Sequence, residues 1–430
     1  MAITWRAVAL AAFGVVVVLV LPVPGTILVW SLLVVALCGV DVWLAASPRS
    51  VRVERSVPPS VRLSEAVTSH LTLTNLGRRR LRGPVRDAWQ PSAGAQDARS
   101  TVDLPPGESR RLATLLVPTR RGDRLADRVT IRALGPLGLA GRQVSLTVPA
   151  RLRVLPEFAS RRHLPSRLAR LRELDGRAAV QVRGAGTEFD SLREYVIGDD
   201  VRSIDWRASA RRSDVVVRTW RPERDRRVLI VVDTSRTSAA RIQDAPRLDA
   251  SIDAALLLAA LASRAGDRVE LVAYDRAVRA RVAGASGPRL LPALADALAT
   301  VEPALVEADW PGIVNLVRER LSQRALVVLL SALDPAAVEQ GLLRVVGQLT
   351  QRHQVVLASV RDPEVEELRA NHRDVTAVFD AAAADRTELE RDAVAARLRD
   401  QGVEVVDALP DALAPRVADM YLALKAAGKL

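Results

Sequence analysis

The chain has 430 residues with a formal net charge of +12; apolar residues make up 49% of it and charged residues 26%. This balance is typical of globular domains and excludes a disordered chain or a collagen. A single cysteine, Cys38, and four scattered histidines exclude a disulfide framework and a zinc site built on cysteine or histidine. Aromatic residues at 3% leave little for stacking on nucleic-acid bases.

The first 48 residues contain two apolar segments separated by Pro-Val-Pro-Gly at 22–25. The first segment runs from 5 to 21 and the second from 26 to 46, and a membrane span needs roughly 20 apolar residues. The sequence therefore predicts a transmembrane helical hairpin over residues 1–48. A signal peptide would have one apolar stretch, and a buried soluble hairpin would need a large partner surface.

Positive charge follows the second apolar segment. Residues 49–160 have a net charge of +11, residues 161–227 of +6 and residues 228–430 of −5. Because basic residues stay on the cytoplasmic side, we expect a cell-membrane protein with two spans whose remaining domains are cytoplasmic. Anionic lipid headgroups would attract these basic residues, although an arginine-rich composition alone explains them equally well. Nucleic-acid binding has only the charge in its favour.

The rest of the chain divides by its hydrophobic pattern. Residues 49–158 alternate apolar and polar residues in short runs between turn signals, which predicts an immunoglobulin-like β-sandwich. From residue 228 apolar runs alternate with helical segments, which predicts an α/β domain with a parallel, doubly wound sheet over 228–430. The fold class expected is thus multidomain α+β. Ligands of such a sheet bind beyond the carboxyl ends of its strands.

The first strand of this sheet ends in Asp233-Thr234-Ser235-Arg236-Thr237. Asp233, Ser235 and Thr237 lie at alternate positions and offer hard oxygen donors of the kind that Mg²⁺ prefers. A metal site with one open position would accept a carboxylate from a partner. The pattern is short, and the same side chains can instead hydrogen-bond the backbone amides of the following segment.

Residues 159–227 connect the two domains and contain the most unusual run of the chain, at 184–223. Arginines and acids alternate in it, which favours an ion-pair network that holds a non-regular segment between the domains, with Trp206 and Trp220 as buried anchors. Contact with a partner is the alternative for part of this surface. The residues singled out are Gly184, Glu188, Phe189, Leu192, Arg193, Tyr195, Gly198, Asp199, Arg202, Asp205, Trp206, Ala210, Arg211, Arg218 and Glu223.

This run, followed by a strand that ends in Asp-Thr-Ser-Arg-Thr, resembles the bacterial domain of unknown function 58 family. The order of membrane hairpin, β-sandwich, signature segment and C-terminal von Willebrand factor A-like domain also matches that family, over essentially the whole chain. The resemblance implies a membrane-anchored accessory protein without established enzymatic activity. It also implies MoxR-type AAA+ ATPases and transglutaminase-like proteins as partners, since their genes commonly lie beside those of the family.

Two ligands of a complete metal-ion-dependent adhesion site are missing. Ala332 stands where the pattern has an acid, with Asp334 two residues further on, and Asp309-Trp310 occupies the loop that normally supplies a threonine. Arg236 adds a repelling charge, so we expect no cofactor and at most weak Mg²⁺ binding.

The function predicted is a non-enzymatic protein-interaction module that uses a degenerate adhesion-type face. The alternatives are a metal-dependent hydrolase on a Rossmann-like sheet, which Ala332 argues against, and a basic binder of membrane surfaces or nucleic acids.

Overall fold

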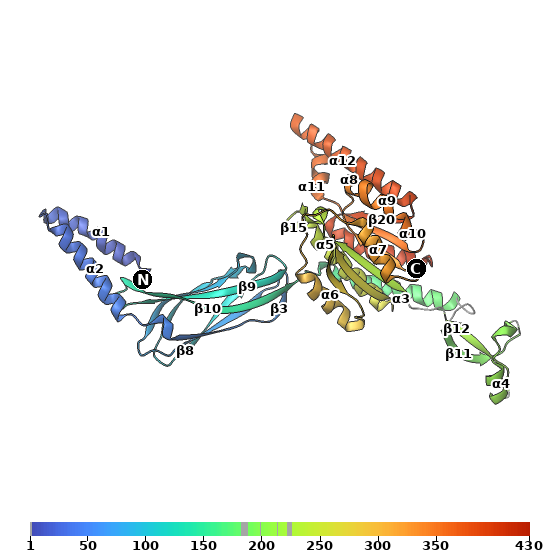
Figure 1. Ribbon diagram of the computed structural model, residues 1–430, viewed down its shortest axis with the longest axis horizontal. Coiled ribbons are helices and arrows are strands. Elements are labelled where there is room, and N and C mark those ends of the chain that lie inside the picture. Colours follow the sequence, from blue (N-terminus) through green and yellow to red (C-terminus); the bar gives the residue numbers. More distant parts are fainter. Residues whose placement is uncertain (1, 182–187, 198, 213, 222–225) are drawn as a thin grey trace. The chain divides into compact units, whose positions relative to one another are not determined.

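The computed structural model describes residues 2–181, 188–197, 199–212, 214–221 and 226–430. The chain forms two compact units, Met1–Glu157 and Phe158–Leu430 (Figure 1). The second unit therefore begins well before residue 228, because α3 (Leu164–Gln181) packs against it through Leu171, which lies in its hydrophobic core. The predicted connecting segment 159–227 is thus partly a helix of the second unit.

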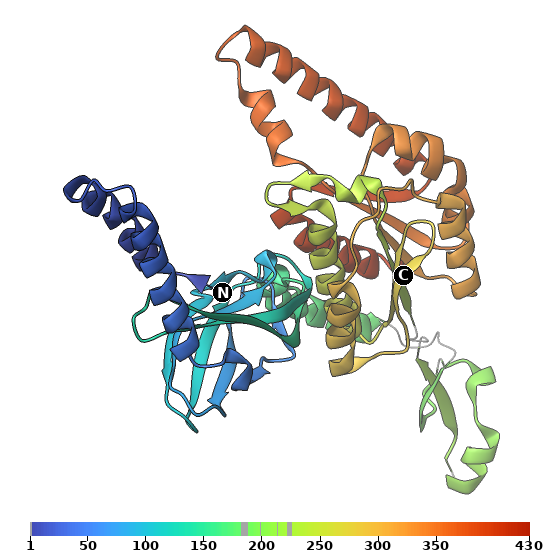
Figure 2. The same cartoon turned by 60° about the vertical axis from the view of Figure 1, so that its left-hand side comes forward.

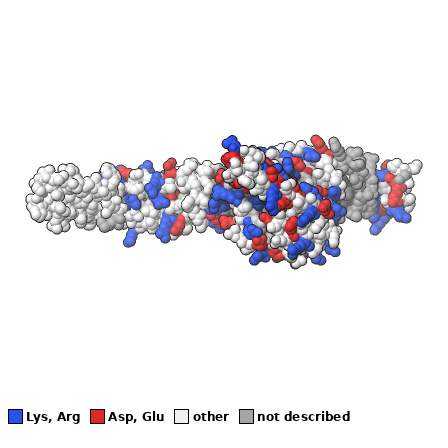
Figure 3. Space-filling model, turned by 90° about the horizontal axis from the view of Figure 1, so that it is seen from above, with Lys and Arg blue, Asp and Glu red and all other residues white. Residues whose placement is uncertain are grey.

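The two apolar segments form helices α1 (Trp5–Val20) and α2 (Thr26–Leu44). They pack side by side, and the Trp30 indole donates a hydrogen bond to the Leu10 carbonyl at 3.2 Å. Among the described residues, α2 is the helix long and apolar enough to cross a membrane. Helix α1 has 16 residues and a length of about 24 Å, less than the roughly 30 Å of a bilayer core. Almost no charged atoms are seen on these helices in Figure 3.

Polar contacts join the end of the helix pair to the first β-sheet. Asp41 is fully buried, and its carboxylate accepts hydrogen bonds from the backbone amides of Leu137, Leu139 and Ala140, each at 2.8 Å. The Thr4 hydroxyl donates to the Gly138 carbonyl at 2.7 Å. Burying a carboxylate costs free energy unless it is hydrogen-bonded, and these three amides provide the hydrogen bonds.

Two β-sheets enclose two buried hydrophobic clusters in the first unit. One sheet has the order β2-β4-β8-β6, and the other has β1-β10-β9-β5-β7 with β3 paired to β10. Leu71 and Leu73 of the first sheet pack with Val85 and Ile131 of the second in one buried cluster. The strands are β1 (Ala2–Ile3), β2 (Val51–Ser56), β3 (Ser60–Arg62), β4 (Val67–Asn75), β5 (Leu81–Trp89), β6 (Ala95–Gln96), β7 (Arg99–Leu104), β8 (Ser109–Leu116), β9 (Gly122–Leu134) and β10 (Ala140–Leu155).

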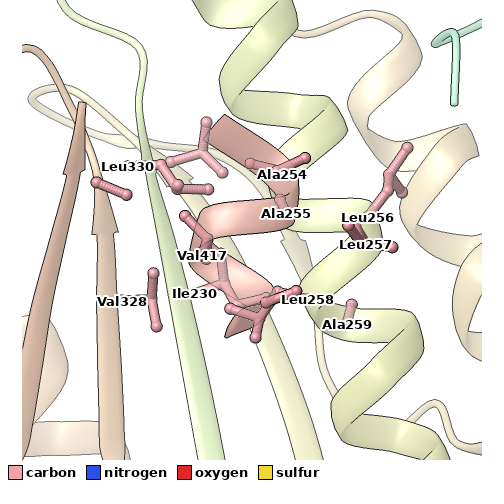
Figure 4. Packing of buried hydrophobic residues seen from close by; sticks show 14 of the residues in the cluster. Ile230, Ala254, Ala255, Leu256, Leu257, Leu258, Ala259, Val328, Leu330 and Val417 are labelled. Carbon is pink, nitrogen blue, oxygen red and sulfur yellow. The ribbon is translucent and has the colours of Figure 1, made fainter. Parts of the chain in front are cut away.

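The second unit contains a six-stranded sheet of order β17-β16-β13-β18-β19-β20, parallel except at β17. Successive residues of β13 enter different cores, because side chains alternate across a strand. Ile230 packs in the cluster with α5 and α13, and Leu229 in the cluster with α7 and α12. Figure 4 shows Ile230 and Val417 in the first of these cores. The prediction of a parallel sheet covered on both faces is confirmed for five strands, whereas the edge strand β17 is antiparallel.

The strands of this sheet are β13 (Arg227–Asp233), β16 (Arg268–Tyr274), β17 (Val278–Val282), β18 (Leu326–Leu330), β19 (Gln354–Val360) and β20 (Val403–Ala408). Its helices are α5 (Arg247–Arg264), α6 (Leu290–Ala299), α7 (Trp310–Arg320), α8 (Pro335–Ala337), α9 (Leu343–Val345), α10 (Gly347–Thr350), α11 (Pro363–Ala370), α12 (Val375–Asp400) and α13 (Pro410–Ala426). Helices α11 and α12 form an antiparallel arm, coloured orange to red in Figure 2.

Candidate functional site

The candidate site lies at the carboxyl edge of the second unit's sheet, where β13 ends in Asp233. The Asp233 side chain is buried and accepts three hydrogen bonds. The Ser235 backbone amide donates to Oδ1 at 2.8 Å, while the hydroxyls of Ser331 and Thr237 donate to Oδ2 at 2.6 and 3.2 Å. The structure thus gathers the three residues selected from the sequence. It adds Ser331, which follows β18 and reaches Asp233 because β18 lies beside β13.

The donors at this edge do not form a complete Mg²⁺ site. Ala332 is buried and brings no side-chain oxygen. The Asp334 carboxylate accepts the Ala337 amide at 2.9 Å as the cap of α8, and Asp309 caps α7 through the Gly312 amide at 3.0 Å. No cluster of three acidic, histidine or cysteine side chains suited to a metal occurs in the described part of the chain. One carboxylate and neutral hydroxyls supply too few ligands for Mg²⁺, which requires octahedral coordination.

A second buried carboxylate, Asp275, supports the same loop from the end of β16. It accepts hydrogen bonds from the Thr234 hydroxyl at 3.0 Å and from the Arg279 Nε at 2.7 Å. Burial alone would raise the pKa of Asp275, but the hydrogen bonds from Arg279 and from the neighbouring amides outweigh it and hold the pKa below the usual range. Asp275 was not selected from the sequence, although its position directly after an apolar strand could have indicated it.

The loop over residues 301–309 covers the other side of the Asp233 loop. The Ala304 amide donates to the Thr234 carbonyl at 2.7 Å, and the Arg236 amide donates to the Val306 carbonyl at 2.8 Å. The Arg236 side chain, which is half exposed, forms an ion pair with Glu307. The positive charge of Arg236 is therefore paired with Glu307 at a half-exposed position of this edge.

A cluster of paired charges lies at the ends of β19 and β20. Arg391 of α12 is buried, and its Nη2 lies 2.8 Å from Oδ1 of Asp407. Arg361 contacts the other Asp407 oxygen at 3.2 Å and Glu388 at 3.0 Å. Burial disfavours the charge on Arg361, but the Asp407 carboxylate outweighs this and raises the pKa of the guanidinium. Three elements meet here, the ends of β19 and β20 and helix α12, so the sequence offered no local pattern for this cluster.

The signature segment forms a small antiparallel hairpin from β11 (Glu188–Glu194) and β12 (Val216–Arg221). A 3₁₀ turn at Val201–Ser203 and helix α4 (Trp206–Arg212) lie between the strands. Asp205 caps α4: the Ala208 amide, the Arg218 guanidinium and the Arg207 amide all donate to it and lower the pKa of its carboxyl. The expectation of a non-regular segment is therefore wrong.

Exposure also corrects the role predicted for this hairpin. Trp206 is 67% exposed, so it is no buried anchor. The ion pairs Arg193–Asp199 and Arg218–Asp205 have exposed arginines, and the recorded hydrogen bonds of the described residues 188–218 stay within this segment. Arg202, Ala210 and Arg211 are exposed, while Leu192 and Tyr195 are half-buried. Gly184, Gly198 and Glu223, with the side chains of Glu188, Phe189 and Trp220, lie outside what the structure describes.

Comparison with known proteins places the chain in a family. Residues 191–404 match the family described as "Protein of unknown function DUF58". The chain belongs to this family. The match begins in β11 and ends in β20, so it includes the hairpin and most of the second unit. It leaves out the apolar helices and the two sheets of the first unit.

The uncharacterized protein Rv1480 of Mycobacterium tuberculosis is 28% identical over 190 residues, and so is the uncharacterized protein Mb1516 of Mycobacterium bovis. These alignments cover 44% of this chain and 59% of each relative. Among solved structures, the CARDB domain of the Pyrococcus furiosus protein PF1109 is similar over 23% of this chain and 91% of that domain, with 22% identity and a TM-score of 0.17. The human complex of zinc 2-glycoprotein with prolactin inducible protein gives 15% identity over 24% of this chain and 92% of the other, with a TM-score of 0.20.

Proposed function

We propose that this chain is a membrane-anchored, non-enzymatic interaction module that engages a MoxR-type AAA+ ATPase through the carboxyl edge of its α/β sheet. In this proposal the second unit is a von Willebrand factor A-like domain and the carboxyl edge is a degenerate adhesion-type face. The observation that carries the proposal is the position of Asp233. If the strands of this sheet are numbered from 1 to 6 in chain order, their order across the sheet is 3-2-1-4-5-6. Ligands of such sheets bind at the point where the strand order reverses. Asp233 ends the first of these strands.

The chemistry of this edge favours binding over catalysis. A hydrolase needs a carboxylate or another base that is free to move a proton at the reacting atoms. Asp233 and Asp275 are each held by several hydrogen bonds, Asp309 and Asp334 cap helices, and Asp407 is paired with two arginines. Exposed groups such as Arg236 and Glu307 remain for contact with a partner.

The anchor in this proposal is the helix pair. We propose that α1 crosses the membrane together with α2, extended by the residues at its ends, and that the first unit's sheets form an immunoglobulin-like sandwich on the cytoplasmic side. Support comes from the apolar side chains that both helices expose and from the arginines that follow α2, starting with Arg49 and Arg52. A transglutaminase-like protein is proposed as a second partner. The basis for it is that genes of such proteins commonly lie beside genes of the family that this chain resembles.

The test is capture of the MoxR-type ATPase of the same organism by the tagged full-length protein in detergent. Arg236→Glu reverses an exposed charge at the carboxyl edge, and Arg324→Glu is the matched control because Arg324 is an exposed arginine that precedes β18, at the opposite edge. We expect capture by the parent and by Arg324→Glu, with a clear loss for Arg236→Glu. No capture by the parent, or equal loss in both variants, would refute the proposal.

A further inference from the structure

A pocket of about 570 Å³ opens next to the candidate site, at the amino end of α5. The two-residue strands β14 (Arg241–Ile242) and β15 (Ala245–Pro246) form one wall, and Pro410 at the start of α13 contributes to another. Ile242, Ala245, Ala250 and Pro410 make most of the lining apolar. This volume lies within the range of pockets that bind small molecules or short peptide segments.

Arg247, the first residue of α5, is the cation of this pocket. Its Nη1 donates to the Thr237 carbonyl at 2.9 Å, which ties the side chain to the Asp233 loop. Its Nε is buried and has no acceptor, and no carboxylate lies within ion-pair distance of it among the residues that the structure describes. This half-buried cation therefore lacks the carboxylate partner that a poorly solvated arginine normally has.

The electrostatics around Arg247 agree with this geometry. Burial lowers the pKa of its guanidinium, and the positive charge of Arg391 adds to that effect. The carboxylates of Asp362, Asp334 and Asp407 act in the opposite direction from beyond ion-pair distance and do not compensate. A bound anion would stabilise this charge, because an opposite charge in a poorly solvated place interacts more strongly than it does in water.

We propose that this pocket binds a carboxylate carried on a short apolar group, with Arg247 as its ion-pair partner. The inference rests on the proposed function and names the chemistry that a protein partner presents to this face. A planar guanidinium recognises a carboxylate through two parallel hydrogen bonds, and the apolar lining accommodates the attached aliphatic group. Arg247 thus supplies, beside the Asp233 loop, the positive charge that a metal ion would supply in a complete adhesion-type site.

The rim of the pocket favours a single negative charge over a multiply charged anion. Asp244 lines the pocket with a fully exposed side chain, 3.5 Å from Arg241. Its charge repels phosphate more strongly than it repels a monocarboxylate. The ligand class assigned is therefore a monocarboxylate of a peptide, either its carboxyl end or an acidic side chain.

The experiment titrates the full-length protein in detergent with N-acetyl-leucine and, separately, with N-acetyl-leucinamide, and follows the ligand by NMR. The two probes differ only in the carboxylate. We expect the amide to bind about tenfold more weakly or worse, because a hydrogen-bonded ion pair is lost. Arg247→Gln should weaken the binding of N-acetyl-leucine to the same extent, and Ala250→Leu should weaken it by filling the pocket with the charge intact.

Arg264→Gln is the matched control, since Arg264 is an exposed arginine at the opposite end of α5 and lies outside the pocket lining. It should bind like the parent, and thermal melts should show that all variants fold. Three outcomes would overturn the inference: no binding to the parent, equal binding of the amide, or an equal loss in Arg264→Gln. Tighter binding of inorganic phosphate than of N-acetyl-leucine would overturn the carboxylate class. Normal N-acetyl-leucine binding without ATPase capture would refute the proposed partner and leave this pocket assignment standing.

Discussion

The carboxyl edge of the α/β sheet and the hairpin of residues 188–221 both combine arginines with acids, yet they use them differently. At the edge, Asp233 is buried with three donors, and Arg391 and Asp407 pair with about a tenth of each side chain exposed. In the hairpin, Arg218 is 48% exposed where it meets Asp205. Removing one partner of a buried pair leaves an uncompensated charge, whereas water screens an exposed pair. Similar residues therefore stabilise the fold in one region and shape a surface in the other.

The largest effect is expected for Arg391→Ala, which leaves Asp407 with one arginine fewer and opens a buried site. We expect the free energy of unfolding to fall by about 3–5 kcal/mol. Urea denaturation of the full chain in detergent measures it. Arg397→Ala is the control, because Arg397 lies on the same helix but pairs with Glu339 at the exposed surface. Equal stability of both variants would show that the buried cluster stabilises the fold no more than an exposed ion pair does.

A smaller loss is expected for Ser331→Ala, which removes the 2.6 Å hydrogen bond to Asp233. Hydrogen bonds to charged groups contribute about 1.5–3 kcal/mol, so the free energy of unfolding should fall within that range. Ser322→Ala is the control, since Ser322 is an exposed serine at the opposite end of the same strand.

Added Mg²⁺ should stabilise neither the parent nor Ser331→Ala. Calorimetry that finds micromolar Mg²⁺ affinity, lost in Asp233→Ala, would instead make Asp233 a metal ligand and contradict this interpretation of the edge.

A change of pH should also separate the α/β sheet from the hairpin. His353 is buried just before β19, its Nδ1 has no hydrogen-bond partner, and burial, with a contribution from Arg352, lowers its pKa from the ordinary 6.5. The folded state therefore binds the proton less readily than the unfolded state does. This contribution to stability is complete above pH 6.5 and is lost as the pH falls below that value and through the folded pKa.

Thermal melts of the full chain between pH 7.5 and 5 should show this loss, and His353→Gln should reduce it. The hairpin of residues 188–221 contains no histidine and should not respond. An unchanged pH dependence in His353→Gln would assign the effect to other groups.

The smallest effect is expected for Arg207→Ala and Arg218→Ala. Both side chains are exposed, so the midpoint of thermal unfolding should match that of the parent. This expectation differs from the one drawn from the sequence, which placed these arginines in an ion-pair network that holds the segment between the two domains. A marked drop for either variant would mean that another part of the chain covers the hairpin.

The sequence predicted the parts of this molecule whose signal is local. Buried parallel strands are continuous apolar runs, and Val228–Asp233 is such a run, so the sheet could be recognised. The spacing of Asp233, Ser235 and Thr237 is equally local. Ser331 and Asp275 reach the same place only through strand pairing, and no spacing in one sequence encodes that.

The errors have physical reasons as well. Trp206 looked like an anchor because large rings are usually buried, but a two-stranded hairpin with one short helix has too little surface to enclose it. The segment after residue 159 looked like a linker because it is polar. Leu171 and the other leucines of α3 nevertheless give that helix one apolar side, which packs against α5.

The contact between Asp41 and the turn at 137–140 has a mechanical consequence. Helix α2 passes into the first unit without a flexible tether, because its last turn is clamped by three amides and by the Arg142 guanidinium, which donates to the Val42 carbonyl at 3.0 Å. Strands β9 and β10 continue from this clamp, and the 16 residues of β10 extend about 50 Å. If α2 crosses the bilayer as proposed, a tilt of a few degrees in the helix would swing the far end of these strands through several ångströms. The first unit would then act as a lever whose short arm is in the lipid.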